Sequence, residues 1–280
     1  MTAQRGLSLT LLLRYTILIL VCVVMMAPVA TAFLGSIRTT GEFLSSPFGL
    51  PQSGIRWENY TNILNGTGFW RSLVNSLLIT AGVTFLNITC ASMLALVFSR
   101  IRFTGRNLLF NLLSLGLLVP VVVAILPIFI QLRRLGLIGN LLGVVLPLAA
   151  FGLPGSTVIL RGFFMNIPSE LEDAAYIDGC TTLGFFYHIL LPLSRPALMA
   201  VAVIQVINSW NDYFVSLLVL LPDPNQWPLP LGIQQFQGQY GTDWAPIMAY
   251  VTLLIIPAIV FYMFTEKYIV TGLTGGELKG

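Results

Sequence analysis

One group of polar residues lies inside a stretch of sequence that is otherwise apolar. Asp212 is the only acidic residue within the hydrophobic windows of the chain, and Asn208, Trp210 and Asn211 lie beside it. Carboxylate and amide groups hydrogen-bond polar solutes, and an ionisable residue at membrane depth is by default a candidate functional residue. We therefore predict that these four residues line a pathway. A hydrogen bond between helices, or solvation of Asp212 near the outer surface, is the alternative explanation.

The sequence offers no comparable group of residues for a catalytic or metal-binding site. The only histidine, His188, lies outside the hydrophobic windows, and no pair of carboxylates or metal-ligand spacing occurs within them. Ser156 has no histidine partner, and Cys22, Cys90 and Cys180 are far apart in the sequence. The sequence therefore predicts a chain that is not an enzyme and that binds no cofactor or metal of its own.

The amino-acid composition indicates the class of protein to which these residues belong. Of the 280 residues, 56% are hydrophobic and 9% are charged, whereas soluble domains carry about 25% charged residues. A soluble domain and a disordered chain are both excluded, because each needs more charge than this. The net charge of +3 is small and the basic residues are scattered, which argues against nucleic-acid binding. The remaining class is an all-α polytopic membrane protein in contact with lipid.

Six windows of the sequence are long and apolar enough to span a bilayer, which takes about 20 residues. One of them contains Asp212, and the others are free of charge. The predicted spans are residues 15–37, 72–99, 107–132, 135–160, 196–221 and 244–265. We therefore predict a six-helix membrane domain over residues 15–265.

The basic residues orient these spans, since cytoplasmic loops retain Lys and Arg. With the N-terminus inside, the inner segments hold Arg5, Arg14, Arg100, Arg102, Arg106, Arg161, Arg195, Lys267 and Lys279, and the outer segments hold Arg38, Arg56, Arg71, Arg133 and Arg134. We predict that both termini are cytoplasmic, with tails at residues 1–14 and 266–280. The segment 36–71 is then an outer loop, and 161–195 is the longest inner loop.

The inner loop 161–195 contains four of the eleven acidic residues and the signals of two short helices. A hydroxyl residue followed by an acid three positions later predicts a helix start, a glycine can end that helix, and a threonine can cap a second one. These positions are Ser169 with Glu172, then Gly179, then Thr181 or Thr182 ahead of a helix that runs to about residue 190, before Pro192. The sequence therefore predicts a helix–turn–helix projection.

Small and aromatic side chains are gathered on the same loop. Ala174 and Ala175 would allow close approach of a partner. Apolar and aromatic residues on a loop that faces water indicate a docking surface for a soluble protein; they are Leu183, Phe185, Phe186 and Tyr187. The alternative is that these side chains pack back onto the ends of the helix bundle.

The spacing of this loop resembles that of a known family. The motif consists of Asp173-Ala174-Ala175, Gly179, Ile189 and Leu191-Pro192. It is similar to the Glu-Ala-Ala loop of the membrane subunits of binding-protein-dependent ABC importers. Likeness to the sugar-importing branch, and to the maltose system in particular, extends to Leu153-Pro154, residues 160–164, Trp210-Asn211-Asp212 and the tail from Gly272 to Gly280. Asp173 and Glu277 depart from the family pattern, which usually has Glu and an apolar residue at these positions.

The resemblance implies a type I importer permease in the inner membrane of a bacterium or archaeon. It implies that the loop, including Glu172, is a coupling helix that inserts into a cytoplasmic ATPase, and that Gly275, Gly276 and Lys279 of the tail reach the same ATPase. ATP and Mg²⁺ would be bound by two partner ATPase subunits. The other implied partners are a second, related permease subunit in a heterodimer, an extracytoplasmic solute-binding protein and a carbohydrate substrate.

A self-contained secondary transporter or channel for a small polar solute is the alternative function. Such a protein usually needs ion-coupling or selectivity groups within its spans, and Asp212 is the only ionisable candidate that the windows offer. Gradient-driven uptake by vesicles that contain this chain alone would distinguish the two functions.

Overall fold

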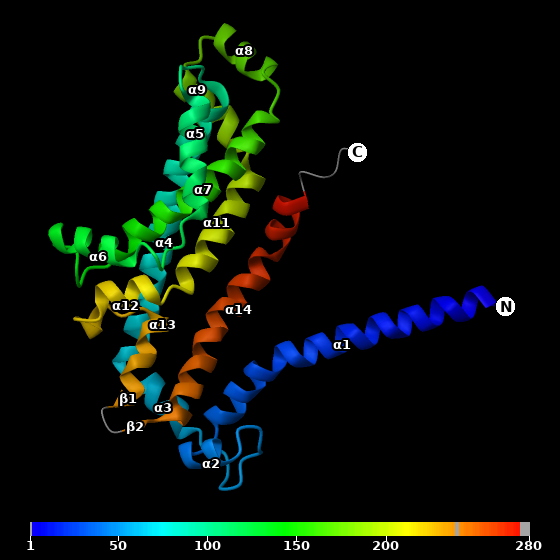
Figure 1. Cartoon of the computed structure of the whole chain (residues 1–280), viewed down its shortest axis with the longest axis vertical. Helices are drawn as coiled ribbons and strands as arrows, with labels where there is room; N and C mark the ends of the chain where they lie inside the picture. Colours follow the sequence, from blue (N-terminus) through cyan, green and yellow to red (C-terminus); the bar gives the residue numbers. More distant parts are fainter. Residues whose placement is uncertain (1, 239–240, 275–280) are drawn as a thin grey trace. The chain divides into compact units, whose positions relative to one another are not determined.

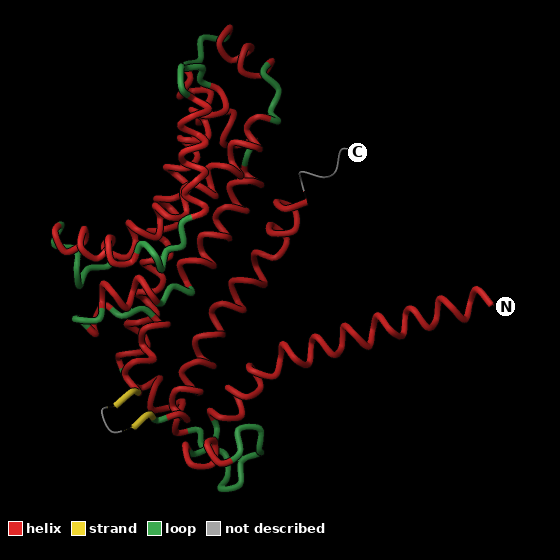
Figure 2. Tube along the Cα trace, viewed as in Figure 1, coloured by secondary structure: helices red, strands yellow, loops and turns green. Residues whose placement is uncertain are grey.

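The computed structural model describes residues 2–238 and 241–274, most of which are helical (Figures 1 and 2). They form two compact units, described separately below. The first contains the chain up to Thr67 together with Ile233–Pro257, and the second contains Gly68–Gly232 and the chain from Ala258 onward. The predicted all-α class is confirmed, since the only strands among the described residues form one short antiparallel pair.

The first unit surrounds a buried arginine. Its elements are α1 (Thr2–Ser36), α2 (Thr40–Ser45), α3 (Glu58–Asn65), η4 (Ile233–Phe236), β1 (Gln237–Gly238), β2 (Gly241–Thr242) and the beginning of α14 (Trp244–Thr274). Arg38 is 1% exposed and donates hydrogen bonds to the backbone oxygens of Leu34, Ser46 and Pro47 at 2.7–2.9 Å. The guanidinium thus connects the end of α1 to the chain that directly follows α2.

A capping box begins α2 within this segment. The Thr39 side chain accepts from the backbone N–H of Glu42, whose carboxylate accepts from the backbone N–H groups of Thr39 and Ser53. Hydrogen bonds from the side chain and backbone of Ser53, with that from Thr39, hold the pKa of Glu42 below its ordinary value of 4.5. The folded segment therefore favours the carboxylate form of Glu42.

This pKa predicts how the segment responds to acid. A group whose pKa is lowered by folding stabilises the fold above its unfolded pKa, and this stabilisation is lost as the pH falls through the folded pKa. We expect the protection factor of the Ser53 amide in hydrogen exchange to fall as the pH drops below 4.5. Glu42→Gln should abolish this dependence and Glu58→Gln should preserve it. A protection factor independent of pH in the unsubstituted protein would contradict the assignment.

The second unit holds most of the apolar helices. Its elements are α4 (Thr67–Arg100), α5 (Arg106–Leu115), η1 (Gly116–Leu118), α6 (Ile125–Arg134), α7 (Leu142–Met165), α8 (Glu170–Ile177), α9 (Thr182–Phe185), η2 (Phe186–Leu190), α10 (Leu191–Leu193), α11 (Arg195–Trp210), α12 (Phe214–Leu220), η3 (Pro224–Gln226), α13 (Leu229–Gly232) and the part of α14 from Ala258 onward. Helices α4, α7 and α11 lie alongside one another, and α8 lies at one end of this bundle (Figure 1). Ala91, Ala95 and Ala197 are almost fully buried between them. Small residues at such positions let helices in a membrane approach closely.

The described residues contain four helices long and apolar enough to cross a membrane. They are Leu11–Ser36, Thr67–Arg100, Leu142–Met165 and Trp244–Thr265. A fifth span arises if Thr182–Leu193 and Arg195–Trp210, which meet at a bend of 77°, are counted as one. The predicted windows at residues 15–37, 72–99 and 244–265 correspond closely to single helices. The total of six spans stays a prediction.

Two predicted windows are interrupted, and both breaks contain residues unsuited to a helix interior. The window 107–132 is divided between α5–η1 and α6, with turns from Pro120 to Ala124 between them. Pro120 has no backbone N–H to continue the helix. The window 196–221 is divided between α11 and α12, and Asp212 lies in the turn between these two helices. The helix predicted to begin at residue 135 begins instead at Leu142, because Gly136 and Gly139 adopt positive φ angles of 68° and 79° before it.

Candidate functional site

The turn at Gly179 has the conformation that the sequence predicts. Gly179 has a φ of 79° and follows Asp178, the residue that caps the C-terminus of α8. Its N–H donates to the carbonyl of Tyr176 at 3.1 Å, and the N–H of Cys180 donates to that of Ala175 at 2.9 Å. These two bonds are those of a Schellman motif, which satisfies the last carbonyl groups of a helix. Cys180 and Ala175 also belong to the same apolar cluster, so the turn is packed as well as hydrogen-bonded.

The predicted capping box at the start of α8 is wrong. Ser169 has helical angles, φ −68° and ψ −23°, and its side chain makes no capping hydrogen bond. A capping residue normally has extended angles that turn its side-chain oxygen toward the first N–H groups. The Glu172 carboxylate does not reach back to Ser169 either, because it is engaged by Arg100 and Tyr176.

The second helix of the loop starts as predicted but does not stop where expected. Thr181 has extended angles and its hydroxyl accepts from the N–H of Gly184 at 3.1 Å, so Thr181 is the cap. The helix then continues past residue 190 as η2 and α10, and it includes Pro192. The π-helical η2 lies directly before α10, and Pro192 occupies the first turn of α10, where a missing N–H costs little. The sharp bend comes at Ser194 instead.

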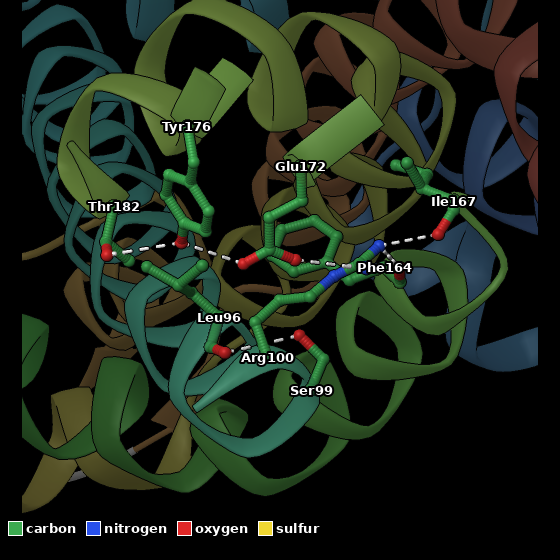
Figure 3. Close-up of polar contacts among 8 residues, drawn as sticks. All are labelled: Leu96, Ser99, Arg100, Phe164, Ile167, Glu172, Tyr176 and Thr182. Carbon is green, nitrogen blue, oxygen red and sulfur yellow. Dashed lines mark hydrogen bonds and ion pairs between the residues drawn. The ribbon is translucent and has the colours of Figure 1, made fainter. Parts of the chain in front are cut away.

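A buried arginine connects this loop to the bundle (Figure 3). Arg100, the last residue of α4, pairs with the Glu172 carboxylate at 3.3 Å and donates to the backbone oxygens of Phe164 and Ile167 at 2.6 and 2.7 Å. The Tyr176 hydroxyl donates to the other oxygen of Glu172 at 2.9 Å and lies 3.3 Å from the Thr182 hydroxyl. Sequence reasoning assigned Arg100 only to the positive charge of the inner loops, and it missed Tyr176.

The same contacts act on the Tyr176 hydroxyl in opposite directions. The hydrogen bond with Thr182 acts to lower the pKa of Tyr176, while burial and the hydrogen bond and charge of Glu172 raise it. The net effect is a pKa above the ordinary value of 10.0. Tyr176 therefore stays protonated at neutral pH and can continue to donate to Glu172.

The aromatic residues of the loop divide between the two predicted environments. Phe185 and Phe186 are 0% and 1% exposed and pack in the cluster formed by α4, α7 and α11. Leu183 and Tyr187 are exposed, and so is Ile177, which is 86% exposed. The first pair thus packs back onto the bundle, whereas the other three side chains are exposed, as are Ala174 and Asp173.

A polar-edged cavity lies within the second unit. It has a volume of about 280 Å³ and is lined by Val83, Val121, Val122, Leu148, Phe151, Gly152, Gln205, Asn208, Ser209, Asp212 and Phe214. Asn208 and Asp212 therefore face the same space, and their part in a pathway stays a prediction. Trp210 and Asn211 are not among the lining residues. Trp210 is 9% exposed, and the Asn211 amide donates to the carbonyl of Ile207 at 2.8 Å.

Asp212 also fixes the start of α12. Its carboxylate accepts hydrogen bonds from the N–H of Val215 at 3.3 Å and from the N–H and hydroxyl of Ser216 at 2.9 and 2.8 Å. A carboxylate at this position caps the helix and interacts favourably with its dipole. The carboxylate is thus both a wall of the cavity and the anchor of the turn between α11 and α12.

A second polar group beside the cavity was not predicted. Asn87 on α4 donates to the carbonyl of Ala149 at 2.8 Å, and Gln205 on α11 donates to the Ser156 hydroxyl at 3.0 Å. Both amides crowd Gly152 of α7, where an added Cβ would lie 2.5–2.7 Å from their polar atoms. Asn87 and Gln205 are polar residues within apolar windows, and this was the only feature of the sequence that could have pointed to them. The predicted tail residues Gly275, Gly276 and Lys279 lie outside the described residues.

A bundle of apolar helices with a polar-edged cavity and a short helix pair at one end is the architecture of a membrane transport subunit. Residues 87–274 match the family described as "Binding-protein-dependent transport system inner membrane component". The chain belongs to this family of inner-membrane transport components, as the motif in residues 173–192 predicts.

Relatives and a solved structure agree with this assignment. The chain is 30% identical over 269 residues to the diacetylchitobiose uptake system permease protein NgcG of Streptomyces coelicolor, covering 95% of this chain and 88% of that protein. It is 32% identical over 256 residues to the arabinooligosaccharides transport system permease protein AraQ of Bacillus subtilis, covering 90% of each. A chain in the crystal structure of a bacterial ABC transporter that imports alginate has a TM-score of 0.77 at 23% identity, with 92% of this chain and 95% of that chain covered. This likeness confirms the predicted importer-permease fold.

Proposed function

We propose that the chain is the permease subunit of an ATP-driven carbohydrate importer and forms half of its pathway. A second, related permease subunit would supply the other half, two cytoplasmic ATPase subunits would bind ATP and Mg²⁺, and an extracytoplasmic binding protein would deliver the solute. The observation that carries the proposal is the pair of helices α8 and α9, fixed at Gly179 and carrying exposed apolar side chains, in a chain of this transport family. Such side chains suit a cytoplasmic protein partner.

The coupling contact is assigned to the exposed part of this helix pair. Asp173 and Ala174 are exposed, while Ala175, Ile189 and Leu191 pack against the apolar cluster. The first two residues would meet the ATPase, and the others, with Gly179 and Pro192, would hold the projection rigid. Gly275, Gly276 and Lys279 of the tail would add a further contact to the ATPase. A rigid projection can pass movement of the ATPase to the spans.

The proposed topology has six spans with both termini cytoplasmic. The four long helices and the bent pair supply five spans, and the shorter apolar helix Arg106–Leu118 supports the sixth. The helix pair α8–α9 is then cytoplasmic. In a chain whose native Cys22, Cys90 and Cys180 are replaced by serine, a cysteine introduced at Ser169 should be modified by a membrane-impermeant maleimide only in inside-out vesicles, and one at Gln52 only in right-side-out vesicles. Both residues are exposed, so the opposite pattern would reject this orientation.

The solute is assigned to the carbohydrates, either mono- or oligosaccharides. NgcG and AraQ are named for the uptake of oligosaccharides, and Asn208 and Asp212 provide hydrogen-bonding groups at the cavity. Trp210 and Asn211 would support these two residues from the same turn. Amide and carboxylate groups can both bind the hydroxyl groups of a sugar.

Reconstitution tests the function directly. The chain is purified with its partner permease, ATPase and binding protein and placed in proteoliposomes, and import of the sugar retained by the binding protein is measured. Import that requires ATP and the binding protein is expected. Gradient-driven uptake by this chain alone, without ATPase, would instead identify a secondary transporter or channel.

Asp212→Asn is expected to lower sugar import about fivefold while the ATPase still co-purifies. Asparagine presents one acceptor oxygen where the carboxylate presents two, so it cannot accept all the hydrogen bonds from Val215 and Ser216, and loss of one bond worth about 1 kcal/mol corresponds to a change of that size. Ser216→Ala is the control, because it removes one hydrogen bond and keeps the carboxylate and its bond to the Ser216 N–H. Loss of the whole complex in Asp212→Asn would show that the residue is needed for assembly and would contradict its proposed role in the pathway.

A further inference from the structure

Arg100 joins three elements of the second unit at one point. It ends α4, it reaches the backbone oxygens of Phe164 and Ile167 at the end of α7, and it pairs with Glu172 in the first turn of α8. The side chains of Arg100 and Glu172 are only 9% and 15% exposed. This is the one ion pair within the part of the chain that the structure describes. An ion pair so protected from water is weakened little by salt, and removal of either partner leaves a charge without compensation.

The chemistry of the junction is specific to arginine. The carbonyl groups at the end of a helix lack intrahelical partners, and a positive charge beside them is favourable. One nitrogen of the guanidinium donates to the carbonyl groups of Phe164, in the last turn of α7, and Ile167, just after that helix, and another faces the carboxylate of Glu172. A lysine ammonium is a single point charge without this planar fork, so it cannot reproduce the three contacts together.

Glu172 extends the junction to the second helix of the loop. Its other oxygen accepts from the Tyr176 hydroxyl, which also contacts the Thr182 hydroxyl at the start of α9 (Figure 3). The neighbouring acids Glu170 and Asp173 are exposed instead. The acidic side chains of α8 therefore divide into one that faces the bundle and two that face away from it.

We propose that Arg100 is a positioning residue for energy coupling, which makes α8 move as one body with the ends of α4 and α7. Glu172 acts through Arg100 and Tyr176, and it does not contact the ATPase, for which Asp173 is left free. The inference rests on the proposed function, because it assigns the route by which movement of α8 reaches the spans. Packed elements linked by hydrogen bonds and ion pairs transmit such movement as rigid bodies.

The test is made in the complete complex in proteoliposomes, by measuring sugar imported per ATP hydrolysed. Arg100→Gln and Glu172→Gln are each expected to lower this ratio about fivefold, a change within the range of coupling networks, while binding-protein-stimulated ATP hydrolysis persists. The double variant should be no worse than either single variant, since both remove the same link. Arg100→Lys should recover part of the ratio. Arg102→Gln, which removes an exposed arginine two positions along, is the matched control and should keep the normal ratio.

Several outcomes would overturn the inference. A normal ratio in Arg100→Gln, or effects of the two single variants that add in the double variant, would show that the residues do not form one link. If Arg100→Gln does not accumulate, the variants Glu172→Gln and Tyr176→Phe replace it in the test. A lowered ratio in both supports the link, and a normal ratio in either one rejects it. Absence of ATP-dependent import by the unsubstituted complex would instead reject the proposed function itself.

Discussion

Gly179→Leu is expected to lower sugar import at least tenfold while the protein still inserts into the membrane and binds its ATPase. At this position nothing lies within 4 Å of an added Cβ, so the side chain meets no steric obstacle. The cost comes from the backbone, because a φ of 79° disfavours residues with a Cβ by about 1–2 kcal/mol. Relief of that strain breaks the Schellman turn, and α8 then loses its fixed direction relative to α9. The measurement is import and ATP hydrolysis by the same proteoliposomes.

Two substitutions separate this effect from general destabilisation. Gly179→Asn should retain most of the import, since asparagine tolerates the left-handed conformation better than leucine does. Gly105 also has a positive φ, 87°, with nothing within 4 Å of an added Cβ, but it lies before α5. Gly105→Leu should bear a similar strain and keep the normal amount of sugar imported per ATP. If Gly105→Leu and Gly179→Leu uncoupled import equally, the effect could not be assigned to the turn between α8 and α9.

Local signals in the sequence predicted the parts of the loop that depend on neighbouring residues. Gly179 ends α8 and Thr181 caps α9, because each acts through its own backbone angles and hydrogen bonds within a few positions. The predicted capping box at Ser169 is wrong, because the Glu172 side chain makes a tertiary contact with Arg100 in place of the local one. Glu172 pairs with a residue 72 positions away, and no spacing rule in one sequence connects the two. The role of Arg100 therefore became visible only when α4 and α8 were placed in space.

In the membrane windows, too, the sequence predicts local features and misses those that depend on distant contacts. Hydropathy over about 20 residues locates apolar segments well, but it averages over a break of a few residues. The interruption at Pro120 is an example, as is the turn at Asp212 between α11 and α12. Polar residues inside a window carry further information that hydropathy discards. Asn87 and Gln205 are buried and hydrogen-bonded beside the cavity, and a sequence pattern alone cannot pair α4 with α11 across α7.

Gly152→Ala is expected to lower sugar import at least tenfold and to reduce the melting temperature of the purified complex. The added methyl group would lie 2.5–2.7 Å from the amides of Asn87 and Gln205, so those side chains must move. Their hydrogen bonds to Ala149 and Ser156 are then lost, and each buried polar group left unpaired costs about 1–3 kcal/mol. Because Gln205 and Gly152 both line the cavity, the displacement also changes the shape of the proposed pathway.

Gly155→Ala on the same helix is the matched control for this prediction. Its added Cβ would meet only a Leu117 methyl group at 3.5 Å, an ordinary contact. Both substitutions gain the same helix propensity of about 1 kcal/mol, so their difference isolates the crowding at Gly152. Import and melting temperature should be near normal for Gly155→Ala. If the two variants behaved alike, the amide pair around Gly152 would have no part in transport, and Asn208 and Asp212 would remain as the polar groups to test at this cavity.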